Sequence, residues 1–240
     1  METDIFGKAL LDYMNGNYKE DIVTYSSLDE EDTIPIPYLF RTFDDMPGIE
    51  QKALGLCRGN VLDIGCGAGS HSLYLQEKGV QVTALDHSLG AIKTCIRRGI
   101  TNTINCPILD LTLPKFDTLL LLMNGIGIVG NLDALKNYLM HFKSLLRPKG
   151  QILLDSSDII YMFDTDEGDS ADNRDDLVAE DGYYGEVYFT LRYRELTSAS
   201  FPWLYLDQNT LKKVALACDL RCEIVSLGEH YDYLARLSCL

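Results

Sequence analysis

The stretch VLDIGCGAGSHSLYL, residues 61–75, decides the prediction of the fold. A short apolar run at residues 61–64 ends in a glycine-rich turn, and an amphipathic stretch typical of a helix follows it. A strand, glycine turn and helix in this order bind a nucleotide, because the first N–H groups of the helix are free to donate to an anionic group. The pattern leaves two alternatives open: a dinucleotide with its pyrophosphate, or a nucleotide of different charge.

Short apolar runs alternate with amphipathic stretches on both sides of this turn, which is typical of βαβ units and a parallel sheet. The run FDTLLLLMN is too apolar for a strand with one face in water. We therefore expect an α/β fold with a doubly wound sheet. The predicted strands are 60–65, 80–86, 100–105, 116–124 and 151–157, and the predicted helices are 49–57, 70–79, 89–99 and 132–146.

The flanking segments follow other patterns. Residues 1–20 predict a helix, and residues 20–48, with three prolines, predict a long covering segment without regular helix or central strand, commonly a lid. We expect a solvated acidic loop at 164–181 and an inserted β-hairpin at 185–206 with an aromatic face, which suits an acceptor pocket, the core or a dimer interface equally. A closing helix and two strands joined at Gly228 follow. The predicted units are 1–48 (helix and lid), 49–160 (α/β core), 161–206 (loop and hairpin) and 207–240 (closing helix and strands).

Composition limits the function classes. The net charge of -15 repels polyanions, so nucleic acid is not an expected partner. No apolar run approaches the roughly 18 residues that span a bilayer, and the acidic start is unlike a signal peptide, so we expect a cytoplasmic protein without a membrane partner. Seven cysteines without a CxxC pair predict neither a disulfide framework nor a metal site.

Charge separates the two nucleotide alternatives. Asp63 lies just before the glycines and suits a cationic group better than a pyrophosphate, and Ser70 departs from the dinucleotide fingerprint. S-adenosylmethionine (SAM) brings an ammonium and a sulfonium to such a turn. Asp86 ends the second strand, where a carboxylate accepts the ribose hydroxyls of either nucleotide.

The segments VLDIGCGAG, VTALDHS, FDTLLLLMNGIG and LLRPKGQILLDSS together resemble the class I SAM-dependent methyltransferases. The resemblance implies a Rossmann-like sheet of seven mostly parallel strands with an antiparallel last strand. It also implies a cofactor site, in which Asp63, Gly65, Cys66, Gly67 and Gly69 hold the methionine part. In this site Asp86 holds the ribose with His87 beside it, and Ile108, Leu109 and Asp110 flank the adenine. Met123 and Asn124 face the methionine and the transferred methyl group. Pro107 stands near the place of an adenine-binding acid in many relatives, so Asp110 or a backbone carbonyl would serve instead.

Candidates for chemistry at the methyl group lie where the predicted strands end, since open α/β sheets bind ligands at that edge. We favour Asn124 and Asp155 as catalytic candidates; Ser156, Asp158 and His230 are further ones. Turn-capping by Asp155 and Asp158, and a hydrogen-bonded turn position for His230, are the structural alternatives. His71 lies in the first turn of the helix after the glycines, where it can touch the ligand.

Arg41, in the lid segment, has two possible roles. It can pair with the SAM carboxylate or an acidic acceptor, or it can form a surface ion pair with Asp44 or Asp45.

The sequence thus predicts a SAM-dependent methyltransferase acting by in-line transfer on a small molecule. The run LMNGIG lacks the [DN]PP[YF] motif associated with flipped adenines and amides. The alternatives are a protein methyltransferase, a non-catalytic SAM-binding sensor or partner subunit, and a nicotinamide oxidoreductase on the same core; a homodimer is compatible with each.

Overall fold

A sheet of seven strands forms the core of the protein in a computed structural model that describes residues 4–163 and 182–240. The strand order is β11-β12-β7-β6-β3-β4-β5, and β12 runs in the direction opposite to the other six strands. This confirms the predicted doubly wound sheet with an antiparallel last strand. The strands are β3 (Asn60–Ile64), β4 (Gln81–Asp86), β5 (Thr103–Asn105), β6 (Phe116–Leu121), β7 (Leu146–Ser157), β11 (Leu220–Leu227) and β12 (Asp232–Cys239).

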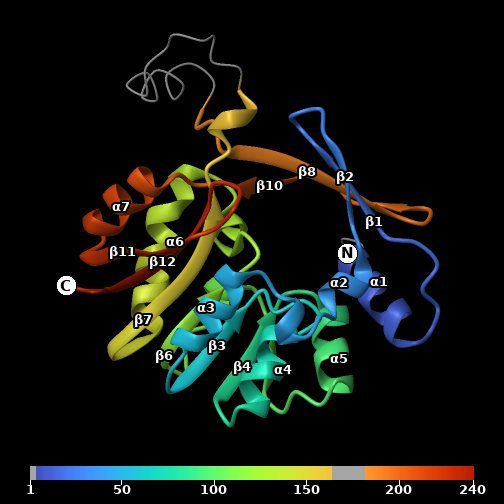
Figure 1. The fold of residues 1–240 in the computed structure, drawn as a ribbon, viewed down its shortest axis with the longest axis horizontal. Coiled ribbons are helices and arrows are strands. Elements are labelled where there is room, and N and C mark those ends of the chain that lie inside the picture. The colour runs from blue at the N-terminus through green and yellow to red at the C-terminus, as the bar shows by residue number, and fades with distance from the viewer. Residues whose placement is uncertain (1–3, 164–181) are drawn as a thin grey trace.

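Helices cover both faces of this sheet (Figure 1). Leu119 and Leu121 of β6 point to the face covered by α6 and α7, whereas Leu120 and Leu122 point to the face covered by α3 and α4. All four leucines are buried, which explains why the strand reads as a continuous apolar run. The helices are α3 (Gly48–Leu56), α4 (Ser70–Glu77), α5 (Leu89–Arg97), α6 (Leu132–Leu145) and α7 (Gln208–Ala217).

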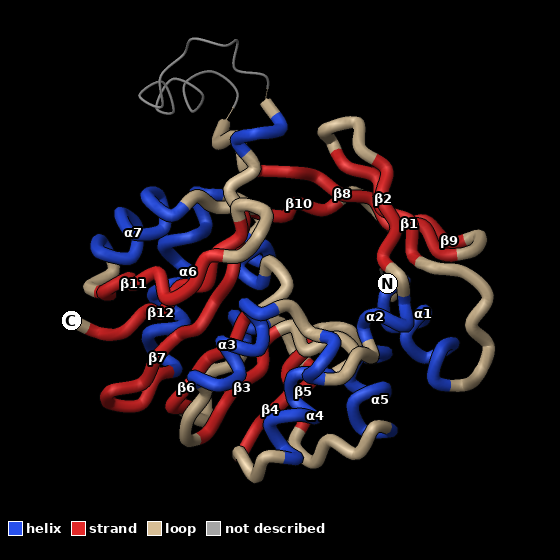
Figure 2. The backbone as a smooth tube through the Cα atoms, in the orientation of Figure 1, coloured by secondary structure: helices blue, strands red, loops and turns tan. Residues whose placement is uncertain are grey.

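A second, antiparallel sheet lies beyond one edge of the core (Figure 2). Its order is β10-β8-β1-β2, and β9 also pairs with β8. The strands are β1 (Ile22–Ser26), β2 (Glu31–Ile34), β8 (Glu186–Tyr193), β9 (Leu196–Thr197) and β10 (Phe201–Leu204). The inserted hairpin is therefore confirmed, and it shares one sheet with a hairpin from the N-terminal segment.

The expectation that residues 20–48 lack regular structure is wrong. β1 lies inside the second sheet, between β2 and β8, and its register sets Tyr25 opposite Thr190. The prolines do not prevent this pairing because Pro35 and Pro37 follow β2. They lie instead at the start of a short helix, α2 (Ile36–Leu39), and a 3-10 turn, η1 (Phe43–Asp45), leads on to α3.

Other predictions differ in detail. The N-terminal helix is α1 (Ile5–Met14), and Gly16 follows it with a φ of 73°. The 3-10 turns η2 (Ile108–Asp110), η3 (Gly125–Val129) and η4 (Ile160–Met162) follow β5, β6 and β7. The predicted acidic loop at 164–181 lies outside the described residues. Within the described part of the chain, no helix has the length and hydrophobicity to cross a membrane.

Candidate functional site

The glycine turn connects β3 to α4. Gly65, Gly67 and Gly69 have φ values of 72°, 54° and 81°, a region that residues with a side chain rarely adopt. A Cβ at Gly69 would overlap Ile100 and Cys95. The backbone of Gly69 is therefore held close to α5, and glycine is required here for the path of the chain.

Asp86 lies at this turn, as the sequence predicts. Its carboxylate accepts hydrogen bonds from the N–H groups of Gly67 (2.9 Å) and Ser88 (2.8 Å). Burial raises the pKa of Asp86 although these two bonds favour the charged form. His87 is exposed beside it, with Nδ1 3.6 Å from the Asp86 carboxylate. The carboxylate is thus fixed at the end of β4, next to the glycines.

Asp63 and Cys66 point into the protein. Asp63 accepts a hydrogen bond from Ser72 Oγ at 2.7 Å, and burial raises its pKa. The Cys66 thiol packs against Cys95, with their sulfurs 3.6 Å apart. The Cys66 backbone belongs to the glycine turn, but the side chains of Asp63 and Cys66 pack inside the protein and support the turn from there.

A buried polar network joins α3, α4 and the segment before α3. Arg41 Nη2 donates to Glu50 Oε1 at 2.6 Å, and His71 Nε2 lies 2.7 Å from Glu50 Oε2. The Arg41 guanidinium also donates to Tyr38 O and lies 4.1 Å from the Tyr38 ring centre. Although burial alone would raise it, His71 and Arg41 hold the pKa of Glu50 below its ordinary value. The suggested surface pair of Arg41 with Asp44 or Asp45 is wrong, because Arg41 is buried and pairs with Glu50.

One polar atom of this network has no protein partner. Arg41 Nε is buried, and among the described residues no group accepts its hydrogen bond. A buried N–H without a partner is uncommon and favours a ligand that supplies the acceptor. Sequence reasoning missed Glu50, although its spacing from Ala53 and Leu54 places it on the buried face of α3, where a carboxylate requires a partner.

The turn after β6 carries the methyl-side candidates. Met123 and Asn124 have positive φ values of 65° and 55°. Asp155 holds this conformation by accepting the N–H groups of Met123 (3.0 Å) and Gly125 (2.8 Å), and Ser156 Oγ donates to Asn124 Oδ1 at 2.9 Å. Burial raises the pKa of Asp155 to about 6. Asp155 thus caps the turn after β6. The structural alternative predicted for it is instead to cap the turn after β7, the strand to which it belongs.

The remaining candidates are turn residues. Asp158 accepts the Ile160 N–H and the Tyr184 hydroxyl, which matches its predicted capping role. His230 lies in the exposed turn between β11 and β12, where its backbone N–H donates to the Asp232 carboxylate. On the adenine side, Leu109 and Asp110 are exposed in η2, and Ile108 is buried. The carboxyl ends of β3, β4, β5 and β6 therefore bring most predicted site residues to one edge of the sheet.

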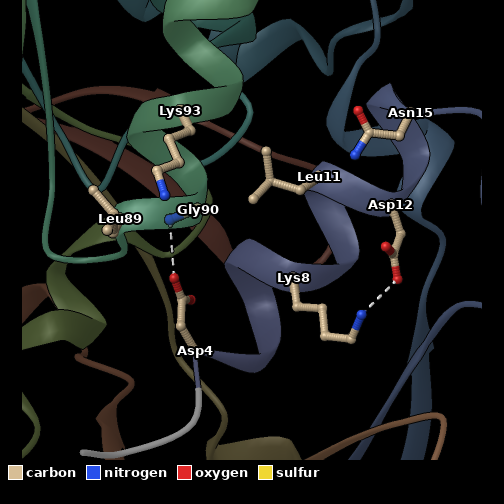
Figure 3. A pocket seen from close by; sticks show the side chains of 8 residues that line it. All are labelled: Asp4, Lys8, Leu11, Asp12, Asn15, Leu89, Gly90 and Lys93. Carbon is tan, nitrogen blue, oxygen red and sulfur yellow. Dashed lines mark hydrogen bonds and ion pairs between the residues drawn. The ribbon is translucent and has the colours of Figure 1, made fainter.

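The N-terminal helix lies against this edge. Asp4 caps α1 and also accepts the Gly90 N–H at 2.9 Å, which ties α1 to α5 (Figure 3). The Ser88 hydroxyl donates to the same carboxylate at 2.8 Å. Phe6 lies beside Gly67. A depression of about 420 Å³ beside this contact is lined by Lys8, Leu11 and Lys93 among others (Figure 3).

The second sheet packs against the rest of the protein at both ends of β8, and the face that carries these contacts is called its inner face. Tyr193 packs with Ile5 and Ala9 of α1, while Val187 belongs to the main core cluster. The Trp203 ring fills the space that a side chain at Gly127 would need, and Asn124 Nδ2 donates to Leu204 O at 3.3 Å. Alternation along β8 turns Phe189 and Leu191 to the same face as its two attached ends. This sheet therefore covers the turn after β6.

Comparisons with known proteins agree with this geometry. Residues 61–150 match the family described as "Methyltransferase domain". No curated protein sequence matches the chain. A SAM-dependent methyltransferase from Bacteroides fragilis, solved in complex with S-adenosyl-L-homocysteine, is 37% identical over 99% of this chain and 95% of its own, with a TM-score of 0.89.

More distant structures share the fold. The sugar N-methyltransferase KedS8 from Streptoalloteichus is 13% identical over 80% of this chain and 85% of its own, with a TM-score of 0.56. SAM-bound CalS10, an amino pentose methyltransferase from Micromonospora echinaspora, is 14% identical over 80% and 87%, with a TM-score of 0.54. Identity and coverage in the Bacteroides protein are high enough to assign the family. The chain belongs to the SAM-dependent methyltransferases, and S-adenosylmethionine is its cofactor.

Proposed function

We propose that this enzyme transfers the methyl group of SAM to a small molecule bound between the turn after β6 and the inner face of the second sheet. The observation that carries the proposal is the contact of Trp203 and Leu204 with the segment from Asn124 to Gly127. A cover attached this close to the methyl-side turn favours a small acceptor over a protein surface. The net charge of -15 argues against nucleic acid as the acceptor.

The residues around the glycine turn fit the cofactor. The Asp86 carboxylate, already oriented by Gly67 and Ser88, would accept the ribose hydroxyls. The first backbone N–H groups of α4 and the unpartnered Nε of Arg41 would donate to the methionine carboxylate. Leu109 would contact the adenine, and Asp110 is the candidate acceptor for its amino group. Met123 and Asn124 would lie beside the methyl group.

The bound cofactor supplies an electrophilic methyl group on a good leaving group. Catalysis by the chain then rests on holding the acceptor in line with that methyl group and excluding water. Asn124 is the candidate group for orienting the acceptor, and Asp155 fixes Asn124 through the backbone of the turn. Because both Asp155 oxygens accept backbone N–H groups, we assign Asp155 a positioning role in place of the predicted catalytic one.

Transfer of labelled methyl from SAM into a cell extract tests the proposal. The extract is separated into small-molecule and macromolecular fractions after the reaction, and Asp86→Ala serves as the inactive control. We expect the label in the small-molecule fraction with the wild-type protein only. Label confined to protein would contradict the proposal and favour a protein acceptor.

A further inference from the structure

The inner and outer faces of the second sheet differ in charge. The register places Asp32 opposite Thr24, and Thr24 opposite Leu191, so Asp32 shares the inner face with Leu191 and Phe189. Glu31 and Arg192 alternate with these residues and lie on the outer face, where Arg192 approaches the ring of Tyr25 at 5.9 Å. Arg192 of β8 therefore lies on the outer face of the second sheet, whereas the exposed carboxylate of Asp32 lies on its inner face.

Aromatic rings lie on the same side of the second sheet as Asp32, and the carboxylate interacts electrostatically with one of them, Tyr205. Tyr205 follows β10 and lies 6.4 Å from Phe189, measured between ring centres. Burial raises the pKa of Tyr205, and the nearby Tyr161 and Asp32 add to the rise. Tyr161 in turn stacks on Tyr231 at 4.9 Å, and both of these rings are more than half exposed. We call Asp32, Phe189, Tyr161, Tyr205 and Tyr231 the aromatic–carboxylate cluster.

This cluster adjoins the place of methyl transfer in the proposed function. Tyr205 lies two positions after Trp203 on the same strand path, and Trp203 covers Gly127 in the turn after β6. Tyr161 belongs to η4, which directly follows β7, the strand that carries Asp155. The cluster thus connects the inner face of the second sheet to the carboxyl ends of the central strands.

The carboxylate and the aromatic rings of the cluster together favour a cationic ligand. Aromatic faces attract a cation through the negative potential of the ring, and a carboxylate adds a direct ionic partner. One Asp32 oxygen accepts the Thr33 N–H at 2.6 Å, which orients the carboxylate without neutralising its charge. An anionic ligand would meet this carboxylate as well as the negative field of the protein.

We propose that the methyl acceptor carries a protonated amine, and that Asp32 and the aromatic rings of the aromatic–carboxylate cluster bind this ammonium group. The inference rests on the proposed function and narrows it to amine-containing small molecules. Asp32 acts as a specificity-determining residue, because it separates an amine from an alcohol or an acid of equal size.

Cyclohexylammonium and cyclohexanol test this inference as a pair of probes that are matched in shape and differ in charge. Their binding is compared by saturation-transfer difference NMR on the full-length protein, with and without S-adenosylhomocysteine. We expect the ammonium to bind roughly fivefold more tightly, as one exposed ion pair and one cation–π contact would give. Asp32→Asn should abolish the preference. Glu31→Gln removes the same charge from the outer face of the same strand and should leave the preference intact.

Equal binding of the two probes to the wild-type protein would overturn the inference. So would equal loss of preference in Asp32→Asn and Glu31→Gln, because general surface charge would then explain the result. The probe comparison without S-adenosylhomocysteine does not depend on the cofactor site. A failure of S-adenosylhomocysteine to bind, or methyl label confined to protein, would therefore contradict the proposed function separately.

Discussion

His71 Nε2 lies 2.7 Å from Glu50 Oε2, and both side chains are buried. Glu50 also accepts the hydrogen bond of Arg41, so its carboxylate joins the segment before α3 to the first turn of α4. Removing the Glu50 charge from this network leaves the buried Arg41 guanidinium uncompensated, which is more damaging than the net value of the network suggests.

Glu50→Gln should therefore destabilise the protein by about 3 kcal/mol or more. Urea unfolding at neutral pH measures this free energy, and Glu77→Gln, an exposed change of the same type in α4, is the control. The pKa of Glu50 is lowered in the folded state, so its charged form stabilises the fold above its ordinary pKa of 4.5, and this contribution disappears as the pH falls below that value. Equal stability of the two variants at neutral pH would contradict the prediction.

Asp86→Ala should weaken SAM binding about 100-fold or more, because two charge-assisted hydrogen bonds to the ribose of ~1.5–3 kcal/mol each would be lost. Isothermal titration with S-adenosylhomocysteine measures the affinity. Since Asp86 also orders Gly67 and Ser88, thermal melting must show that the variant is folded. Asp44→Ala, an exposed change in η1, is the control. A folded Asp86→Ala protein with wild-type affinity would exclude Asp86 from the cofactor site.

Gly127→Ala should disturb the acceptor side and spare the cofactor side. The added methyl group would overlap the Trp203 ring, so β10 must shift or the ring must turn, at a stability cost of about 1–3 kcal/mol. Gly48→Ala adds the same atoms in open space and serves as the control. We expect the Gly127 variant to raise the KM for the acceptor while the affinity for S-adenosylhomocysteine stays the same. An unchanged KM would show that Trp203 does not shape the acceptor site.

The central sheet and its ligand edge were predictable because their signals are local. The glycines, Asp63 and Asp86 stand beside the strands that position them, and apolar runs bounded by turn residues mark each strand. The closing helix is another local case, because Asp207 caps it through the N–H groups of Asn209 and Thr210, which are its neighbours in the sequence.

The second sheet and the buried network were not predictable because they depend on residues far apart in the chain. β1 pairs with β8 across the whole α/β core, and a single sequence carries no signal for that pairing. Asp4 and Gly90 meet for a similar reason. The direction of Asp63 also escaped prediction, since its position before the glycines does not reveal that Ser72 bonds its carboxylate.

Asp155→Asn should change how stability depends on pH. Burial raises the pKa of Asp155 to about 6 from 3.8, so between these values the folded protein keeps a proton that the unfolded chain releases. The contribution of Asp155 is therefore fully present below pH 3.8 and falls as the pH rises to about 6, by roughly 3 kcal/mol in total. Urea unfolding at several pH values across this window measures it, and the stability of the wild type minus that of the variant should fall with rising pH. A difference that stays constant would mean that Asp155 is already ionised in the folded protein below this window.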